Sequence, residues 1–212
     1  ISSDEKNTPR LIITLQHAED FFKSGLENVS NGKFNDALTS FGNIFKVLPL
    51  MIVDESIKTD IYSLLDYARE YSSAMQIELA RRSSNNNKQK QAELAAYFTS
   101  FKLQPFHQIL GLRVAIKSNY SIKCLKTTAN FCRRILELSQ SHKSEKVNKI
   151  VNKKQIMTVL KVCQKNEVDA ETLNYDDTRD FTICMKSLEP LYKDSSKIPI
   201  SKCPYCSACY KQ

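Results

Sequence analysis

The sequence predicts a mainly α fold, in which antiparallel helical hairpins form a bundle and a C-terminal extended β-hairpin is appended to it. Apolar residues recur at helical spacing through most of the 212 residues. Only 4 residues are glycine, which disfavours glycine-rich phosphate loops and tight-turned β sandwiches. Near the C-terminus the apolar residues change to alternate spacing, which is typical of strands.

The first helical hairpin is predicted to begin near Leu11. Its first helix ends at Asn31-Gly32-Lys33 and its second ends at Pro49, which cannot continue a helix. Small residues at Gly25 and Ala37 allow the two helices to approach closely. The spacing of small, aromatic and terminating residues resembles that of a tetratricopeptide (TPR) repeat, although any helical hairpin can carry a similar pattern. The residues with this spacing are Phe21, Gly25, Gly32, Phe34, Ala37, Phe41, Ile44 and Pro49.

More helices must follow, because one such repeat cannot bury its apolar face alone. Asp54 can cap a third helix, Pro105 suits the first turn of a fifth, and Asp169 can cap a last short turn through Leu173. His107, in the first turn of an apolar helix, is expected to be a hydrogen-bonded structural residue. The apolar stripes of these helices lie at residues 57–79, 92–98, 106–114, 122–138 and 147–163.

The predicted organisation has three parts. Residues 1–10 are expected to be a disordered lead, residues 11–174 a TPR-like helical domain, and residues 175–212 an extended, cysteine-rich β-hairpin segment. In the last part Phe181, Ile183 and Met185 alternate with polar residues, which predicts a strand. A turn is expected at residues 193–197, after which a second strand at residues 202–210 pairs with the first. Three prolines exclude a helix here, namely Pro190, Pro199 and Pro204.

Charge suggests one alternative function. The formal net charge is +8, and six lysines lie between Lys143 and Lys161 on what is predicted to be one helix, with Lys146, Lys149 and Lys153 on one face. A basic helical domain that binds anionic lipid or nucleic acid is therefore an alternative. A solvated outer helix face is the favoured interpretation, and no nucleic acid partner is expected because basic surfaces interleaved with aromatic residues are not apparent.

No nucleophile elbow, phosphate loop or metalloprotease motif occurs, so no enzyme activity and no cofactor are predicted. Seven cysteines, most of them scattered singly, favour free thiols in a reducing compartment. A small zinc-binding module is a second alternative, because four thiols near the C-terminus match the number of ligands in a tetrahedral site. Reduced packing thiols are favoured instead, since the spacing lacks two separated CxxC pairs. The four cysteines are Cys184, Cys203, Cys206 and Cys209.

Several strings together resemble the carboxy-terminal domain of the alpha subunit of coatomer, the COPI vesicle coat. The resemblance runs from about His17 to Tyr210 and departs from the family at Cys206, where Ser is usual. The family continues some tens of residues beyond Tyr210, so we expect the appendage to be incomplete in this chain. The strings are Gly32-Lys-Phe34, Ala92-Glu-Leu-Ala-Ala-Tyr-Phe-Thr99, Phe131-Cys-Arg-Arg-Ile-Leu-Glu-Leu138, Cys163-Gln-Lys-Asn166, Leu173-Asn-Tyr-Asp176, Phe181-Thr-Ile-Cys184 and Cys203-Pro204 with Ala208-Cys-Tyr210.

The resemblance implies a structural coat protein that binds the coatomer epsilon subunit, itself a TPR-type solenoid, together with other coatomer subunits. It further implies Golgi-to-ER and intra-Golgi transport, and a cytoplasmic protein associated peripherally with Golgi membranes and COPI-coated vesicles. An exposed β-hairpin is poorly stable alone and needs cover, which a solenoid groove can supply. The alternative is that its apolar side chains pack back on the helical body. The predicted partner-binding residues are Phe181, Ile183, Met185, Pro190, Leu191, Tyr192, Tyr205 and Tyr210.

Overall fold

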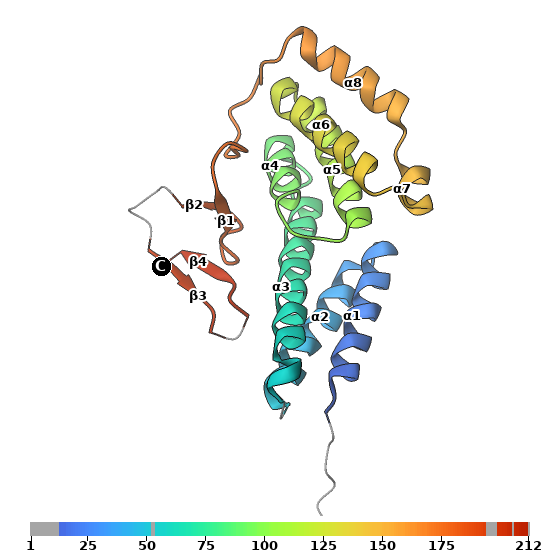
Figure 1. Cartoon of the computed structure of the whole chain (residues 1–212). Coiled ribbons are helices and arrows are strands. Elements are labelled where there is room, and N and C mark those ends of the chain that lie inside the picture. The colour runs from blue at the N-terminus through green and yellow to red at the C-terminus, as the bar shows by residue number, and fades with distance from the viewer. Residues whose placement is uncertain (1–12, 52–53, 194–198, 205, 212) are drawn as a thin grey trace, which may run out of the picture.

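A computed structural model describes residues 13–51, 54–193, 199–204 and 206–211. Within these ranges the chain forms a helical body and a small β appendage beside it (Figure 1). This confirms the predicted fold class, whereas the expected lead at residues 1–10 lies outside the described residues. The helices are α1 (Leu15–Ser30), α2 (Phe34–Val47), the short 3-10 helix η2 (Leu48–Leu50), α3 (Glu55–Ser83), α4 (Lys88–Phe98), α5 (Pro105–Ser121), α6 (Leu125–Ser141), α7 (Glu145–Ile150) and α8 (Lys153–Lys165). The strands are β1 (Phe181–Ile183), β2 (Pro190–Tyr192), β3 (Ile200–Lys202) and β4 (Cys209–Lys211).

Helices α1 and α2 form the predicted hairpin, and a glycine sets how closely they approach. Gly25 on α1 lies directly against the ring of Phe41, so a Cβ at this position would collide with the ring. The turn between the helices places Gly32 at φ 72°, a backbone conformation that favours glycine. The same device recurs at α4 and α5, where Gly111 lies against the ring of Phe98. This second contact was not predicted from the sequence.

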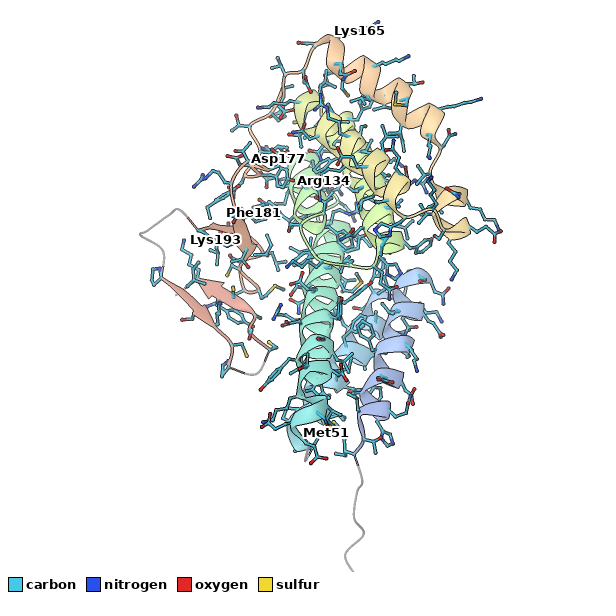
Figure 2. All side chains as sticks on the ribbon, viewed as in Figure 1. Met51, Arg134, Lys165, Asp177, Phe181 and Lys193 are labelled. Atoms are coloured by element: carbon cyan, nitrogen blue, oxygen red, sulfur yellow. The ribbon has the colours of Figure 1, made fainter. Side chains whose placement is uncertain are left out.

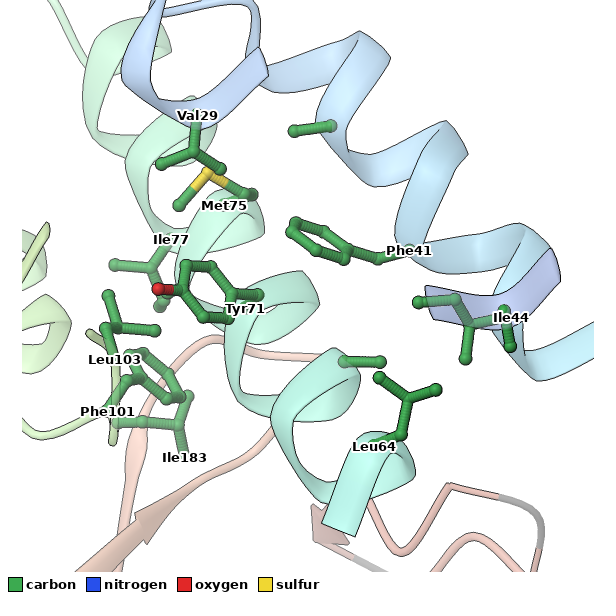
Figure 3. Packing of buried hydrophobic residues seen from close by; sticks show 14 of the residues in the cluster. Val29, Phe41, Ile44, Leu64, Tyr71, Met75, Ile77, Phe101, Leu103 and Ile183 are labelled. Carbon is green, nitrogen blue, oxygen red and sulfur yellow. The ribbon is translucent and has the colours of Figure 1, made fainter. Parts of the chain in front are cut away.

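Two hydrophobic cores lie side by side in the body. The first is built from α1, α2, α3 and the end of α4, and it includes Ile183 from β1 beside Phe101 and Leu103 (Figure 3). The second is built from α5, α6, α7 and α8, with Phe131 and Ile135 at its centre. Helix α4 supplies residues to both cores, so it joins the two halves of the body.

Two helix boundaries differ from the prediction. The single helix expected to carry the apolar stripe at 147–163 is broken at Val151, because Asn152 caps a new helix by accepting a hydrogen bond from the Gln155 N–H at 3.1 Å. The sixth helix begins at Leu125, three residues later than expected, because Lys123 takes φ 60° between α5 and α6.

The cap predicted at Asp169 exists, but it serves a different helix. Its carboxylate accepts hydrogen bonds from the N–H and the hydroxyl of Thr127, at 3.1 and 2.7 Å, in the first turn of α6. The residues after it, through Leu173, are extended and not helical. Asp169 therefore fastens the chain that follows α8 to the start of α6, a contact between residues far apart in sequence.

The appendage contains two antiparallel hairpins, whereas the prediction was one hairpin that paired the first extended run with the second. β1 pairs with β2, with Ile183 opposite Pro190, and β3 pairs with β4, with Lys202 opposite Cys209. Each run turns back on itself because a residue with positive φ, Leu188 or Ser207, closes a tight turn. The turn expected at 193–197 lies, apart from its first residue, outside the described residues.

A chain of hydrogen bonds, buried at its central Tyr71–His107 link, joins α1, α3 and the start of α5. The Gln104 N–H donates to the Tyr71 hydroxyl at 3.0 Å, and that hydroxyl is 2.9 Å from His107 Nδ1. His107 Nε2 is 3.0 Å from the Ser30 hydroxyl, which donates to the Leu26 carbonyl at 2.9 Å. This arrangement suits a neutral imidazole that accepts at Nδ1 and donates at Nε2. The structural role predicted for His107 is confirmed.

Burial, and secondarily the positive charge of Lys146, lower the pKa of His107 to about 4. Burial also raises the pKa of Tyr71 to about 12, although the Gln104 N–H opposes this shift. Both groups are therefore neutral near pH 7, which is the state their hydrogen bonds require.

We expect Gly25→Ala and Gly42→Ala to change stability in opposite directions. The new methyl group at position 25 would displace the Phe41 ring and cost about 1–3 kcal/mol. At position 42, inside α2, the added Cβ would meet no atom within 4 Å beyond the adjoining residues and backbone of its own helix, so higher helix propensity should stabilise the fold by about 0.5–1 kcal/mol. Urea denaturation of both variants measures the two effects, and equal destabilisation would contradict the close approach at Gly25.

We also expect acidification from pH 7 to pH 5 to destabilise the fold through His107. Its pKa is about 4 when folded, against 6.5 ordinarily, so between these values the unfolded chain takes up a proton that the folded chain does not. The contribution of neutral His107 to the free energy of unfolding is complete above about pH 6.5. It falls by up to about 3 kcal/mol as the pH drops to 4. Urea denaturation at pH 7, 6 and 5 tests this. His107→Asn should flatten the slope over this range, and an unchanged slope would assign the effect to other groups.

Candidate partner-binding surface

One face of α4 determines where the appendage begins. Gln89, Glu93 and Tyr97 lie four residues apart, so they share a face of the helix. Gln89 Nε2 donates to the Thr172 carbonyl at 2.8 Å, the Glu93 carboxylate accepts from the Asn174 N–H at 2.9 Å, and the Tyr97 hydroxyl donates to the Asn174 carbonyl at 2.7 Å. These bonds hold the extended chain that leads from α8 to β1.

An aromatic cluster then fixes the first hairpin against the body. The Phe181 ring lies 6.4 Å from Tyr97, 5.9 Å from Tyr175 and 5.6 Å from Tyr192, measured between centroids. Tyr175 in turn lies 5.8 Å from Phe131 of the second core. The Tyr192 hydroxyl accepts a hydrogen bond from the Asp176 N–H at 2.9 Å. Stacking and edge contacts of this kind stabilise an interface beyond the area it buries.

The structure places the predicted partner-binding residues at different depths. Ile183 and Leu191 are 4% and 2% exposed, and Pro190 is also buried, so these three side chains hold the hairpin together and against the body. Tyr205 lies outside the described residues. The remaining four are half-buried and present part of their side chains at the surface: Phe181, Met185, Tyr192 and Tyr210.

The second hairpin has little apolar cover. None of its described side chains belongs to either hydrophobic core, and it meets β1 at the neighbouring backbones of Cys184 and Cys209. Ile200 on β3 is 38% exposed. It was not among the predicted contact residues, although its position in a predicted β segment was a usable signal. Charged residues flank the appendage, since Lys211 lies opposite Ile200 in the β3–β4 register and Lys193 directly follows β2 (Figure 2). Lys193 pairs with Asp180 at 3.2 Å.

The basic run is exposed, but it does not lie on one continuous helix. The break at Val151 separates Lys146 and Lys149 on α7 from Lys153 on α8, so the single basic face predicted for them is wrong. Lys149 pairs with Glu145 at 2.6 Å, and both side chains are largely exposed. Such surface pairs stabilise a fold only slightly. Binding of this region to an anionic surface stays a prediction.

The structure gives no sign that the four C-terminal cysteines gather as metal ligands among the residues it describes. Within the described residues, no cluster of three or more His, Cys, Asp or Glu side chains is placed to hold a metal ion. Burial alone would raise the pKa of the Cys184 thiol. Hydrogen bonds from the Ser187 hydroxyl, from the Lys211 N–H at 3.4 Å and from neighbouring turn N–H groups have the larger opposite effect, so the pKa is lowered to about 7. Cys203, Cys206 and Cys209 are half-buried.

We expect Tyr97→Phe to loosen the appendage. Burial, with the nearby Glu93 carboxylate, raises the pKa of Tyr97, so its hydroxyl remains a donor to the Asn174 carbonyl. Loss of this bond should cost about 1–2 kcal/mol in urea denaturation, because a partly buried carbonyl is left unsatisfied. Tyr62→Phe is the matched control, since Tyr62 is 64% exposed and should tolerate the change. Equal effects in both variants would contradict the anchoring role of Tyr97.

Comparison with known proteins places the chain in one family. The family model for the C-terminus of the coatomer (COPI) alpha subunit matches residues 2–212. Coatomer subunit alpha of Dictyostelium discoideum is 35% identical over 211 residues, covering 95% of this chain, and coatomer subunit alpha-1 of Arabidopsis thaliana is 32% identical over 208 residues, covering 98%. Coatomer subunit alpha of Saccharomyces cerevisiae is 30% identical over 177 residues, covering 82% of this chain and 14% of that protein.

The matched part is a small fraction of these relatives, because this chain spans 16% of the length of the Dictyostelium and Arabidopsis proteins. Among the residues that the structure describes, no helix combines the length and the apolar character needed to cross a membrane. The helical body, the appendage and the matches over nearly the whole chain agree with one another. The chain therefore belongs to the family formed by the C-terminal domains of coatomer (COPI) alpha subunits.

Proposed function

We propose that this chain is a structural part of the COPI coat that docks the coatomer epsilon subunit, and that it performs no catalysis. Family membership supports the coat role, since the relatives are coatomer alpha subunits. The coat role in turn implies contact with other coatomer subunits, transport from Golgi to ER and within the Golgi, and peripheral association with Golgi and vesicle membranes from the cytoplasm.

The observation that carries the docking proposal is the sparse cover of the β3–β4 hairpin. A two-stranded sheet of three-residue strands is marginal in water unless a further surface covers it. In the part of the chain that the structure describes, β3 pairs with no strand other than β4, and Ile200 is exposed next to charged residues. A helical solenoid can cover such an element by wrapping around it or by pairing with its edge.

The predicted partner-binding residues have two different roles in this proposal, according to how deeply each side chain is buried. Ile183, Pro190 and Leu191 are buried within the chain and position the hairpins, so they support docking indirectly. The exposed parts of Phe181, Met185, Tyr192 and Tyr210, together with Ile200, form the proposed contact surface. Aromatic and aliphatic anchors of this kind carry most of the binding energy at typical protein interfaces.

We expect Ile200→Glu to weaken binding to the purified coatomer epsilon subunit by about tenfold or more, because it places a charge at an apolar contact. The matched control is Val162→Glu on α8, which is 42% exposed against 38% for Ile200 and should bind like the wild type. Isothermal titration calorimetry measures both affinities, and light scattering after size exclusion gives the stoichiometry, which should be one to one.

Two results would contradict the proposal in different ways. Loss of binding in both variants, or in neither, would show that the contact does not lie on β3. Separate elution of the wild-type chain and the epsilon subunit, with the chain folded by circular dichroism, would contradict docking by this domain. Deletion of residues 181–212 is a poorer test, because it removes Ile183 from the first core and destabilises the body.

A further inference from the structure

The two hairpins of the appendage are built around the same turn, 19 residues apart in sequence. In the first, the Cys184 N–H donates to the Glu189 carbonyl at 2.9 Å and the Leu188 N–H donates to the Cys184 carbonyl at 2.8 Å. In the second, the Cys203 N–H donates to the Ala208 carbonyl and the Ser207 N–H donates to the Cys203 carbonyl, both at 2.9 Å. Leu188 and Ser207 also have nearly equal φ angles, 57° and 56°.

This turn brings the side chains of its first and fourth residues together. In the first hairpin those residues are Cys184 and Ser187, and the Ser187 hydroxyl hydrogen-bonds to the Cys184 thiol. In the second they are Cys203 and Cys206, whose thiols lie close enough to affect each other's protonation. The backbone hydrogen bonds of the two copies match, and only the second copy has a sulfur atom at both positions.

The surroundings distinguish this pair from the other thiols. Cys203 and Cys206 are half-buried and reachable from solvent, as is Cys209 on β4, whereas Cys124, Cys132, Cys163 and Cys184 are buried. Burial raises the pKa of the first three of these buried thiols, which keeps them protonated and slow to react. The pair belongs to no cluster of three potential metal ligands among the described residues.

We propose that Cys203 and Cys206 are a reversible disulfide site, oxidised by exchange with a low-molecular-weight disulfide such as oxidised glutathione. The Cys203 thiolate attacks one sulfur of the small disulfide, whose other half leaves as a thiolate. The Cys206 thiolate then attacks the Cys203 sulfur in this mixed disulfide and expels the second thiolate. The pair loses two protons and two electrons, and the small disulfide gains them as two thiols.

The order of attack is assigned from the protonation of the two groups. Burial and the neighbouring Cys203 sulfur raise the pKa of Cys206, although the Ala208 N–H partly offsets the shift. Cys203 is therefore assigned the first attack. The backbone hydrogen bonds of the turn bring its first and fourth residues near each other, as a disulfide requires.

Peptide mapping of the full 212-residue chain tests this site. The reduced protein is incubated with oxidised glutathione, quenched in acid, alkylated and digested with trypsin, which releases residues 203–211 in one fragment. We expect that fragment to carry an internal disulfide and one alkylated thiol, with no glutathione retained. Cys209→Ser should form the same disulfide to the same extent, because Cys209 lies on β4 outside the turn. Cys206→Ser should lose it and retain glutathione on Cys203.

Three results would overturn the proposal. The wild-type fragment could retain glutathione on separate thiols, Cys209→Ser could abolish the internal disulfide, or one equivalent of Zn²⁺ could bind the reduced pair and block oxidation. Circular dichroism of each variant confirms that it is folded. Ser187→Cys provides a further check within the same chain, because it converts the first turn into a copy of the second and should create a second internal disulfide between positions 184 and 187.

Discussion

Helix α4 packs against both halves of the body and also anchors the appendage. Residues 92–97 are all buried, so every face of this short helix meets another part of the protein. Leu94 and Tyr97 belong to the first core, whereas Ala95 and Ala96 belong to the second, where only small side chains allow α5 and α6 to approach. Arg134 of α6 donates to the Thr99 carbonyl and hydroxyl at 2.8 and 3.0 Å, which closes the end of α4. One helix therefore fixes the position of the two halves of the body relative to each other.

The same helix determines how the appendage is presented. Its polar face holds the backbone at Thr172 and Asn174, and Tyr97 begins the aromatic cluster that holds β1. The apolar face of the first hairpin is consequently used within the chain, whereas the second hairpin adds no side chain to either core, and among its described side chains only Ala208 is buried. This division explains why side chains of similar apolarity serve different purposes: Ile183 stabilises the fold, whereas Ile200 is available to a partner.

The helical body was predictable because its apolar residues repeat with the period of the helix, and because Gly25 and Pro105 mark a close approach and a helix start. The errors arose where a long-range contact outweighs a local signal. The residues around Asp169 predict that it caps the turn that follows it. In the structure the chain returns to α6, and Asp169 caps that helix instead. Val151 and Asn152 continue an apolar and polar pattern that suits a helix, yet the cap at Asn152 starts a new one. The depth of the contact residues was not predictable, because alternation along a strand defines two faces but not which one the body covers.

The repeated turn of the appendage shows a different limit of sequence reasoning. Its two copies share a cysteine at the first position and little else, and the residues at positive φ are leucine and serine, neither of which signals such a turn. The backbone hydrogen bonds alone make the copies equivalent. Once the backbone is the same, the fourth residue decides the chemistry. A hydroxyl at Ser187 stabilises the thiolate of Cys184 by donating to it, whereas a thiol at Cys206 supplies a second sulfur that can bond to the first.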